Sequence, residues 1–518
     1  MMKIFGNHTK VAKWVISLCF ILIIGILPLS QFAKEIIFHE PIVEMGLFHG
    51  LPTAEKVRSY EKAIEDNSVV SQHARRWFQI LLSRLGNQGT NKVVMGRDNW
   101  LFYRPSLDYV TKPSSSFYRK FEPLPAITAF HQTLKEQGVD LILLPIPGKS
   151  TIYPEFLSKR YDIEYGPAVN PYAEEFFQKL KDEGIHIIDP TDLLWKEKMA
   201  LQDRSLYLQQ DTHWSPEGMK LVANYLSDAI LSGKWIEGIP KKSYKIQPVD
   251  VTRYGDLYDM LNLSEDHTCF SPKTVMVEKV IDSKTGGPCK SDANSPIVLL
   301  GDSFTNVFSK AEMGWGEYGG LAEHLAYNLG IPIDAIALND GGATGSREQL
   351  ARRAYALVGK KVVIWQFPTR DLTNPESQWK IINIPKPSKV EVKPQKHKII
   401  EQVIEKPKEK NLVVMGEVIL VSNVPDPSQV AYSDCLTYIK YRIILVEQGE
   451  YKDNEIIVVF WGMKKSKLMP AARFQLGEKH RLILEPFDKH KELSHFMQAD
   501  DTNDYEHPPY WMLEMQRL

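Results

Sequence analysis

The chain has 518 residues, of which 43% are hydrophobic and 25% are charged. These proportions are ordinary for globular protein, and they exclude a chain disordered throughout, a collagen and a many-pass channel. The 63 Lys and Arg residues nearly balance the 64 Asp and Glu residues, so the formal net charge is -1 and nucleic acid is not an expected partner.

An apolar segment lies close to the start of the chain. Residues 14–30, WVISLCFILIIGILPLS, carry no charge and follow Lys3, Lys10 and Lys13. The segment is at the short end of what spans a bilayer, and the lysines before it predict that the rest of the chain is exported. Because no clear cleavage pattern follows, we expect residues 1–35 to be an uncleaved anchor in the bacterial inner membrane, with the protein in the periplasm. A cleaved signal peptide is the alternative.

Between residues 93 and 384, segments typical of buried strands alternate with segments typical of helices. The expected strands are 93–105, 139–147, 184–190, 296–302, 331–340 and 361–367, and the expected helices are 125–137, 171–183, 216–232 and 346–358. Continuous apolar runs such as VDLILLPIP are typical of strands buried on both faces. The order predicts an α/β fold, a three-layer sandwich with a mostly parallel sheet, over residues 36–384. The stretch between 233 and 295 shows no regular pattern.

The composition changes after residue 384. Residues 385–410 contain eight Lys, four Glu and four Pro, which is typical of a solvated linker. Residues 411–518 contain several strand-like segments separated by turns, such as EIIVVFWGM and HRLILEPF. We expect a small all-β domain there, a barrel or a sandwich. Binding of glycan, binding of a partner protein and a spacer role are its candidate functions.

Four cysteines are present, at positions 19, 269, 289 and 435, and none forms a C-x-x-C pair. A zinc ribbon or a thioredoxin-like motif is therefore not expected. Cys269 and Cys289 could pair in an oxidising compartment, or they could be two unrelated thiols.

The sequence LLGDSFTNVF, residues 299–308, contains the first candidate catalytic residue. A buried strand leads into Gly-Asp-Ser and then into an expected helix, so Ser303 stands at the carboxyl end of a strand, where α/β sheets bind ligands. Free N–H groups at the helix start could stabilise the oxyanion that forms when Ser303 attacks an acyl carbon. The tripeptide alone is equally consistent with an ordinary helix cap.

The sequence QQDTHWSPEGM, residues 209–219, contains the second signal. A serine nucleophile needs a base, and that base needs an orienting carboxylate. Asp211 and His213 stand two residues apart before an expected helix, so their side chains can converge. We expect His213 to take the proton of Ser303 and Asp211 to hold the other imidazole nitrogen. Alternatively, these two residues could cap the helix, pack in the core or form half of a metal site. We find no third metal ligand with suitable spacing, so we expect no metal and no cofactor.

Together these motifs resemble the SGNH hydrolase superfamily, and most closely its branch of bacterial polysaccharide O-acetyltransferases, which includes the alginate acetylation proteins AlgJ and AlgX. In that branch an Asp-x-His pair precedes the serine motif, as it does here. The resemblance extends over roughly 90–375, in the blocks GRDNWLFYR (96–104), PIPGKSTIYPE (145–155), DTHWSPEG (211–218), GDSF (301–304) and VIWQFPTRDL (363–372). The tail after residue 410 does not match the carbohydrate-binding module of AlgX, so we do not carry alginate over as the substrate.

The resemblance implies a covalent acyl-serine intermediate on Ser303, from which an acetyl group passes to a polysaccharide hydroxyl activated by His213. In SGNH enzymes the oxyanion is bound by the N–H of the nucleophile, by a Gly and often by an Asn. The corresponding candidates here are Gly341, Gly342 and Asn306.

Further residues in or beside the matching blocks are candidates for substrate binding. They are Lys149, Tyr153, Arg370 and Trp214, which adjoins His213 and could stack on a sugar ring or belong to the core. The resemblance also implies a membrane-bound O-acyltransferase as the partner that delivers acetyl groups across the bilayer.

Two other functions fit the same residues. One is a carbohydrate esterase or deacetylase that uses the same triad, and the other is a non-catalytic, polysaccharide-binding scaffold of a secretion complex. The sequence does not identify the polysaccharide, the hydroxyl that is modified or the oligomeric state.

Overall fold

A computed structural model describes most of the chain beyond residue 88. The described residues are 89–113, 122–201, 205–261, 263, 270–339, 341–353, 356–374, 377, 379–385, 411–425, 427, 430, 433–465, 467–493, 496–505 and 507–518. The predicted anchor (1–35), all but the first residue of the predicted linker (385–410) and Cys269 lie outside them. Within these ranges, none of the helices has the length and apolar character that crossing a bilayer requires. Cys289 is described, and its buried thiol is free.

The centre of the α/β region is a sheet of five parallel strands in the order β4-β3-β9-β7-β8. Their bounds are His186–Ile187 (β4), Asp140–Ile146 (β3), Val362–Pro368 (β9), Ile297–Gly301 (β7) and Asp334–Ala337 (β8). Every residue of β7 and β9 is buried, which explains the continuous apolar runs in the sequence. The predicted mostly parallel sheet is confirmed.

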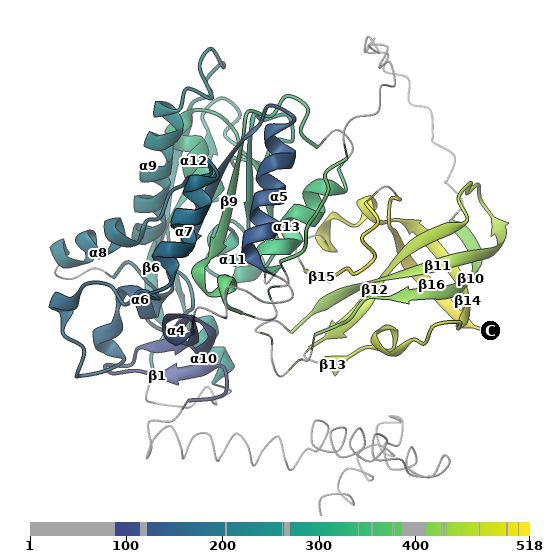
Figure 1. The fold of residues 1–518 in the computed structure, drawn as a ribbon, viewed down its shortest axis with the longest axis horizontal. Coiled ribbons are helices and arrows are strands. Elements are labelled where there is room, and N and C mark those ends of the chain that lie inside the picture. The colour runs from purple at the N-terminus through teal and green to yellow at the C-terminus, as the bar shows by residue number, and fades with distance from the viewer. Residues whose placement is uncertain are drawn as a thin grey trace, which may run out of the picture. The chain divides into compact units, whose positions relative to one another are not determined.

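Helices cover both faces of this sheet (Figure 1). One hydrophobic core packs Ile142 and Leu299 of the sheet against α9 (Pro216–Ser232) and α12 (Leu321–Leu329). The other core packs the alternate strand residues, such as Leu143 and Val298, against α5 (Pro123–Lys135), α7 (Ala173–Asp182) and α13 (Gly342–Ala351). Neighbouring strand residues point to opposite faces, so one sheet supplies both cores and the predicted three layers are confirmed.

The α/β region also contains shorter elements. They are the hairpin β1 (Val93–Met95) and β2 (Leu101–Tyr103), the helices α4 (Arg104–Thr111), α6 (Lys149–Ile152), α8 (Thr191–Ala200), α10 (Asp256–Met260) and α11 (Ser303–Asn306), and the 3-10 turns η3 (Pro154–Phe156), η4 (Ile163–Tyr165), η5 (Ala311–Met313) and η6 (Thr369–Leu372). Several of these short elements carry the candidate site residues.

Two expectations from the sequence were wrong in detail. The stretch between 233 and 295, expected to be irregular, contains a long antiparallel hairpin of β5 (Tyr244–Arg253) and β6 (Lys273–Asp282). No residue of β5 is buried, so the strand lacks the apolar signal that a buried strand shows. The helix expected at 346–358 begins earlier, at Gly342, and ends at Ala351.

The C-terminal region is all-β, as predicted, and its strands form a barrel. The strands are β10 (Leu412–Val421), β11 (Cys435–Gln448), β12 (Glu455–Lys464), β13 (Lys467–Leu468), β14 (Lys479–Pro486), β15 (Met497–Ala499) and β16 (Tyr510–Arg517). Five of them pair in the order β12-β16-β14-β10-β11, and β11 pairs with β12 to close the ring (Figure 1). The interior is filled by buried apolar side chains such as Val414, Ile439, Val458 and Leu482.

A buried ion pair fixes the start of β8. The Asp334 carboxylate, 1% exposed, accepts a hydrogen bond of 2.8 Å from Lys360 Nζ, which is also nearly buried. Lys360 Nζ donates further to the carbonyl oxygens of Ala293 and Ser295. The pair therefore joins β8 to the segment before β7.

Replacing Asp334 tests this pair. Asp334→Asn removes the counter-charge of the buried Lys360 ammonium, so we expect a loss of about 3–5 kcal/mol in the free energy of unfolding. Glu175→Gln is the control, because Glu175 forms an exposed pair with Lys179 and should cost less than about 0.5 kcal/mol. Urea denaturation followed by tryptophan fluorescence measures both variants, and equal losses would contradict this role of Asp334.

Candidate active site

Four loops at the carboxyl ends of the parallel strands carry residues that the sequence singled out. Lys149 follows β3, Ser303 follows β7, Gly342 follows β8 and Arg370 follows β9. Because the strands are parallel, these loops lie at one edge of the sheet, the usual ligand-binding edge of α/β folds.

Ser303 is held at the first position of α11. The Asp302 carboxylate caps this helix by accepting the Phe304 N–H at 2.9 Å, and Ser303 itself is 6% exposed. Gln366 on β9 accepts hydrogen bonds from Asp302 N–H (3.1 Å) and from the Thr305 hydroxyl (2.8 Å). These bonds fix the strand-to-helix turn, so the backbone that carries Ser303 is rigid.

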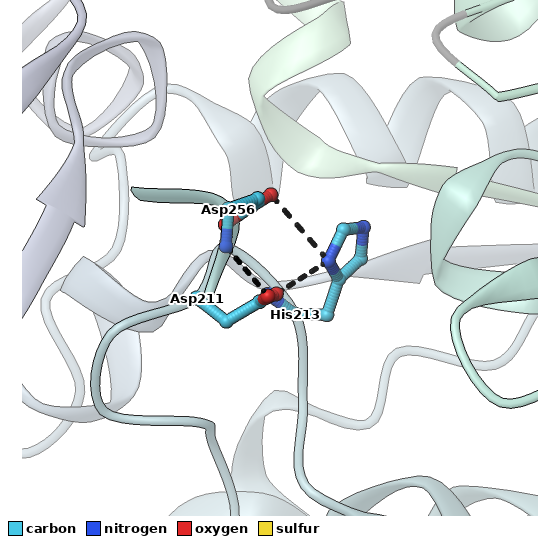
Figure 2. A group of neighbouring side chains, drawn as sticks. All are labelled: Asp211, His213 and Asp256. Carbon is cyan, nitrogen blue, oxygen red and sulfur yellow. Dashed lines mark hydrogen bonds and ion pairs between the residues drawn. The ribbon is translucent and has the colours of Figure 1, made fainter. Parts of the chain in front are cut away.

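His213 and Asp211 form the expected pair. Asp211 Oδ1 lies 2.7 Å from His213 Nδ1 and also accepts the His213 backbone N–H at 3.0 Å. A carboxylate can only accept, so Nδ1 carries the hydrogen and Nε2 has the free lone pair of a base. Nε2 points away from the carboxylate (Figure 2) and has no hydrogen-bond partner among the described residues, Ser303 included.

The second oxygen of Asp211 is bound as well. Asp211 Oδ2 accepts the Trp315 indole N–H at 2.8 Å and the Asp256 backbone N–H at 2.9 Å. Burial opposes ionisation of Asp211, but these hydrogen bonds and the bond from His213 hold its pKa well below the usual range. Burial also opposes a charged His213, but the hydrogen bond and the charge of Asp211 outweigh it and raise the pKa of the imidazole.

The loop of Ser303 lies beside this pair. The Phe304 ring meets the His213 ring edge-on, with 4.9 Å between their centroids, and the charge of Asp302 contributes to the raised pKa of His213. The Arg370 guanidinium lies over the Phe304 ring at 5.6 Å and over the Tyr103 ring at 5.3 Å. The structure thus brings together Arg370, His213 and the residues on both sides of Ser303.

Lys149 has a different role from the substrate binding that was expected. It is 3% exposed, and its Nζ donates to the carbonyl oxygens of Leu208 (2.8 Å), Gln209 (3.1 Å) and Asp211 (2.6 Å). Burial lowers the pKa of Lys149 to about 7, although the charges of Asp211 and Asp256 oppose this shift. All three donors of the ammonium are used by one loop, so Lys149 holds the Asp211 loop and has no donor left for substrate.

Tyr153 and Trp214 belong to the interior, and their expected contact with substrate needs correction. The Tyr153 hydroxyl accepts the Leu206 N–H, and its ring stacks on Trp100 with 4.6 Å between centroids. Trp214 has no exposed surface and contacts the Phe304 ring, so it offers no face to a sugar.

The oxyanion candidates differ in what their N–H groups already bind. Asn306 Nδ2 donates to Ala337 O (3.0 Å) and Asn339 Oδ1 (2.8 Å), which uses both of its hydrogens. The Gly341 N–H donates to Leu338 O at 3.1 Å. Gly342 has a φ of 53°, in the left-handed region that favours glycine, at the first position of α13. Gly342 and the N–H of Ser303 are therefore the better candidates.

Asp256 is a site residue that the sequence analysis missed. Its Oδ2 lies 3.7 Å from His213 Nδ1, so two carboxylates face one imidazole nitrogen (Figure 2). Ligand atoms of Asp211, His213 and Asp256 lie within 4.8 Å of one another, a spacing that would suit a metal ion. However, Nδ1 donates to Asp211, and Asp256 Oδ1 accepts the Thr212 N–H at 2.6 Å. These groups already satisfy one another as a hydrogen-bond network.

A serine at a strand end and a hydrogen-bonded Asp-x-His pair on a parallel sheet are the features expected of an SGNH-type acyl-transfer site. A family model described as "SGNH hydrolase-like domain, acetyltransferase AlgX" matches residues 93–369, just over half of the chain. The chain belongs to this family and is an SGNH-type O-acetyltransferase.

Similar proteins include two probable alginate O-acetylases AlgJ. The chain is 26% identical to the one of Pseudomonas syringae over 322 residues, which are 61% of this chain and 78% of the relative. It is 24% identical to the one of Pseudomonas aeruginosa over 314 residues, which are 57% and 75%. Among solved structures, the O-acetyltransferase domain of Pseudomonas putida AlgJ aligns with a TM-score of 0.44 and 21% identity, over 55% of this chain and 94% of that domain.

The hydrogen bond from Trp315 can be tested separately from the chemistry. Trp315→Phe keeps an aromatic ring but removes the buried N–H donor to Asp211, so we expect about 1–3 kcal/mol lower stability. Trp235→Phe is the matched control, because the Trp235 indole N–H donates to Asp140 at an exposed position. Thermal unfolding compares the two, and a Trp315 variant no less stable than the control would contradict a structural role of this bond.

Proposed function

We propose that the protein transfers acetyl groups through an acyl-serine intermediate to hydroxyl groups of a polysaccharide outside the cytoplasm. Ser303 is the nucleophile, His213 the general base and Asp211 the residue that orients the base. The observation that carries this proposal is the buried Asp211–His213 hydrogen bond at 2.7 Å, which leaves Nε2 without a partner beside the Ser303 loop.

The reaction follows from these groups in two steps. Ser303 Oγ attacks the acetyl carbon of the donor while its proton passes to His213 Nε2, and the proton then goes to the departing donor group. In the second step His213 takes the proton of a sugar hydroxyl, whose oxygen attacks the acetyl carbon. The bond from this carbon to Ser303 Oγ breaks, and His213 returns the proton to Ser303 Oγ. Catalytic hydrogen bonds are often long in a site without substrate, which accounts for the unpartnered Nε2. The N–H groups of Ser303 and Gly342 stabilise the oxyanion.

Alginate is the first acceptor to test. The relatives AlgJ and AlgX are named for the acetylation or the biosynthesis of alginate, and they match the chain over 54–62% of its length. Residues 411–518 fall outside the matching family model, and we propose that this all-β region binds a glycan or a partner. Polysaccharides other than alginate therefore belong in the same assay.

The cellular setting is part of the proposal. Residues 14–30 are apolar and follow three lysines, which supports an inner-membrane anchor with the site in the periplasm. Acetyl donors of the cytoplasm do not reach that compartment. The resemblance to the alginate acetylation proteins implies a membrane-bound O-acyltransferase as the source of the acetyl group.

Replacing Ser303 tests the nucleophile. Ser303→Ala should lower acetyl transfer from an activated acetyl ester to polysaccharide by at least about a thousand-fold, without loss of stability. Ser309→Ala is the control, since Ser309 is also buried but donates to Thr305 and Glu323. Acetylated polymer is measured by mass spectrometry. Ester cleavage without acetylated polymer would favour an esterase, and neither ester cleavage nor acetylation by the unaltered protein would favour a scaffold. Unchanged acetylation by Ser303→Ala would rule out Ser303 as the nucleophile.

The pH dependence tests the base. Only neutral imidazole accepts a proton, so kcat/KM should decrease as the pH falls through the pKa of His213. Because this pKa is raised, the midpoint of the acid limb should lie above 6.5, the ordinary pKa of histidine. Asp211→Asn removes the charge that raises this pKa, so the acid limb should move to lower pH. The rate should fall by about three to four orders of magnitude, as in other serine enzymes that lose this carboxylate. An acid limb unchanged by Asp211→Asn would argue against His213 as the base.

A further inference from the structure

Asp256 is a second carboxylate beside the imidazole of His213. It stands 45 residues after Asp211, at the first position of α10, and the chain brings it back to the same ring nitrogen. Its Oδ2 is 3.7 Å from His213 Nδ1, against 2.7 Å for Asp211 Oδ1 (Figure 2). Two carboxyl groups therefore flank the ring nitrogen opposite the proton-accepting Nε2.

We propose that Asp256 is a positioning residue for His213. Its backbone fixes the Asp211 carboxylate, and its side chain, once ionised, places a negative charge beside Nδ1, which favours the imidazolium that forms when His213 takes a proton from Ser303. The inference rests on the proposed role of His213 as the base. It adds a fourth residue to the expected Asp211, His213 and Ser303.

Two hydrogen bonds join the Asp256 segment to the Asp211 loop in opposite directions. The Asp256 N–H donates to Asp211 Oδ2 at 2.9 Å, and Asp256 Oδ1 accepts the Thr212 N–H at 2.6 Å. The second bond sets the orientation of the Asp256 carboxylate, so that its other oxygen, Oδ2, faces His213. A Cβ at Gly255 would lie 2.2 Å from Gln210 O, so a glycine is needed for the two segments to approach this closely.

The charged groups around Asp256 leave His213 as its partner. The ammonium of Lys149, from α6, is bound to main-chain oxygens of the Asp211 loop, and Arg253 pairs with Asp259 at 3.3 Å. Asp302, from the Ser303 loop, also raises the pKa of His213 through its charge. Within the described part of the chain, His213 is the only basic side chain within ion-pair distance of Asp256.

The ionisation of Asp256 and that of His213 favour each other. Burial and the charge of Asp211 raise the pKa of Asp256 to about 7, whereas the charge of His213 opposes this rise. The carboxylate therefore becomes more acidic as the imidazole gains its proton, and the imidazolium is stabilised in return. About a third of the Asp256 side chain, 31%, is exposed, so it exchanges protons with solvent.

The test is a titration of His213 by NMR in the Ser303→Ala background, with and without Asp256→Asn. Asparagine keeps the backbone N–H and the acceptor for Thr212, but it removes the charge. We expect the pKa of His213 to fall by about one unit, and in the enzyme that retains Ser303 the acid limb of kcat/KM to move to lower pH with about a ten-fold loss of kcat. Asp259→Asn is the matched control on the same helix, 62% exposed, and should leave the His213 pKa unchanged.

A His213 pKa that is the same in the Asp256→Asn protein, with the fold retained, overturns the proposal. If Asp256→Asn does not fold, Asp256→Glu replaces it. Glutamate keeps the charge but displaces it from Nδ1, so kcat should fall while the His213 pKa stays raised, and an unchanged kcat would count against positioning. The titration needs neither donor nor acceptor, so its result stands whether or not Ser303 proves to carry the acetyl group.

Discussion

The buried carboxylate of Asp211 is the point at which three distant segments of the chain meet. It accepts four N–H groups: two from His213, one from the Trp315 indole and one from the backbone of Asp256. A carboxylate without these donors would be costly to bury, so the segments around residues 211, 256 and 315 depend on one another for their positions. The orientation of the candidate base is a consequence of this arrangement.

The sheet and the network contribute different properties to the site. The parallel strands place the Ser303 turn rigidly, through Gln366 and the cap by Asp302. The Asp211 loop has no regular secondary structure. The buried Lys149 ammonium holds it in place by donating to the carbonyl oxygens of Leu208, Gln209 and Asp211. The proposed nucleophile is thus fixed by the scaffold and the proposed base by side chains, which is the kind of preorganisation that acyl transfer needs.

The features of the fold and of the site that could be predicted from the sequence were those whose interacting residues lie close together in the chain. Continuous apolar runs identified β3, β7 and β9, and Pro216 with its preceding serine marked the start of α9 correctly. The Asp-x-His pair was recognisable because its members are two residues apart. Asp256 was not, because its contact spans 45 residues and it follows a strand with no buried residue. Trp214 was placed near substrate because it adjoins His213, but neighbours in a turn point in different directions.

The strand topology of the barrel determines the order in which the strands of the C-terminal region can pair during folding. β16, the last of its strands, pairs with both β12 and β14, so the ring stays open until Tyr510–Arg517 is in place. The hairpin of β10 and β11 forms between nearer segments and requires a smaller loss of chain entropy. Closure is therefore a late event, and until it happens β12 and β14 each present an unpaired edge to other chains.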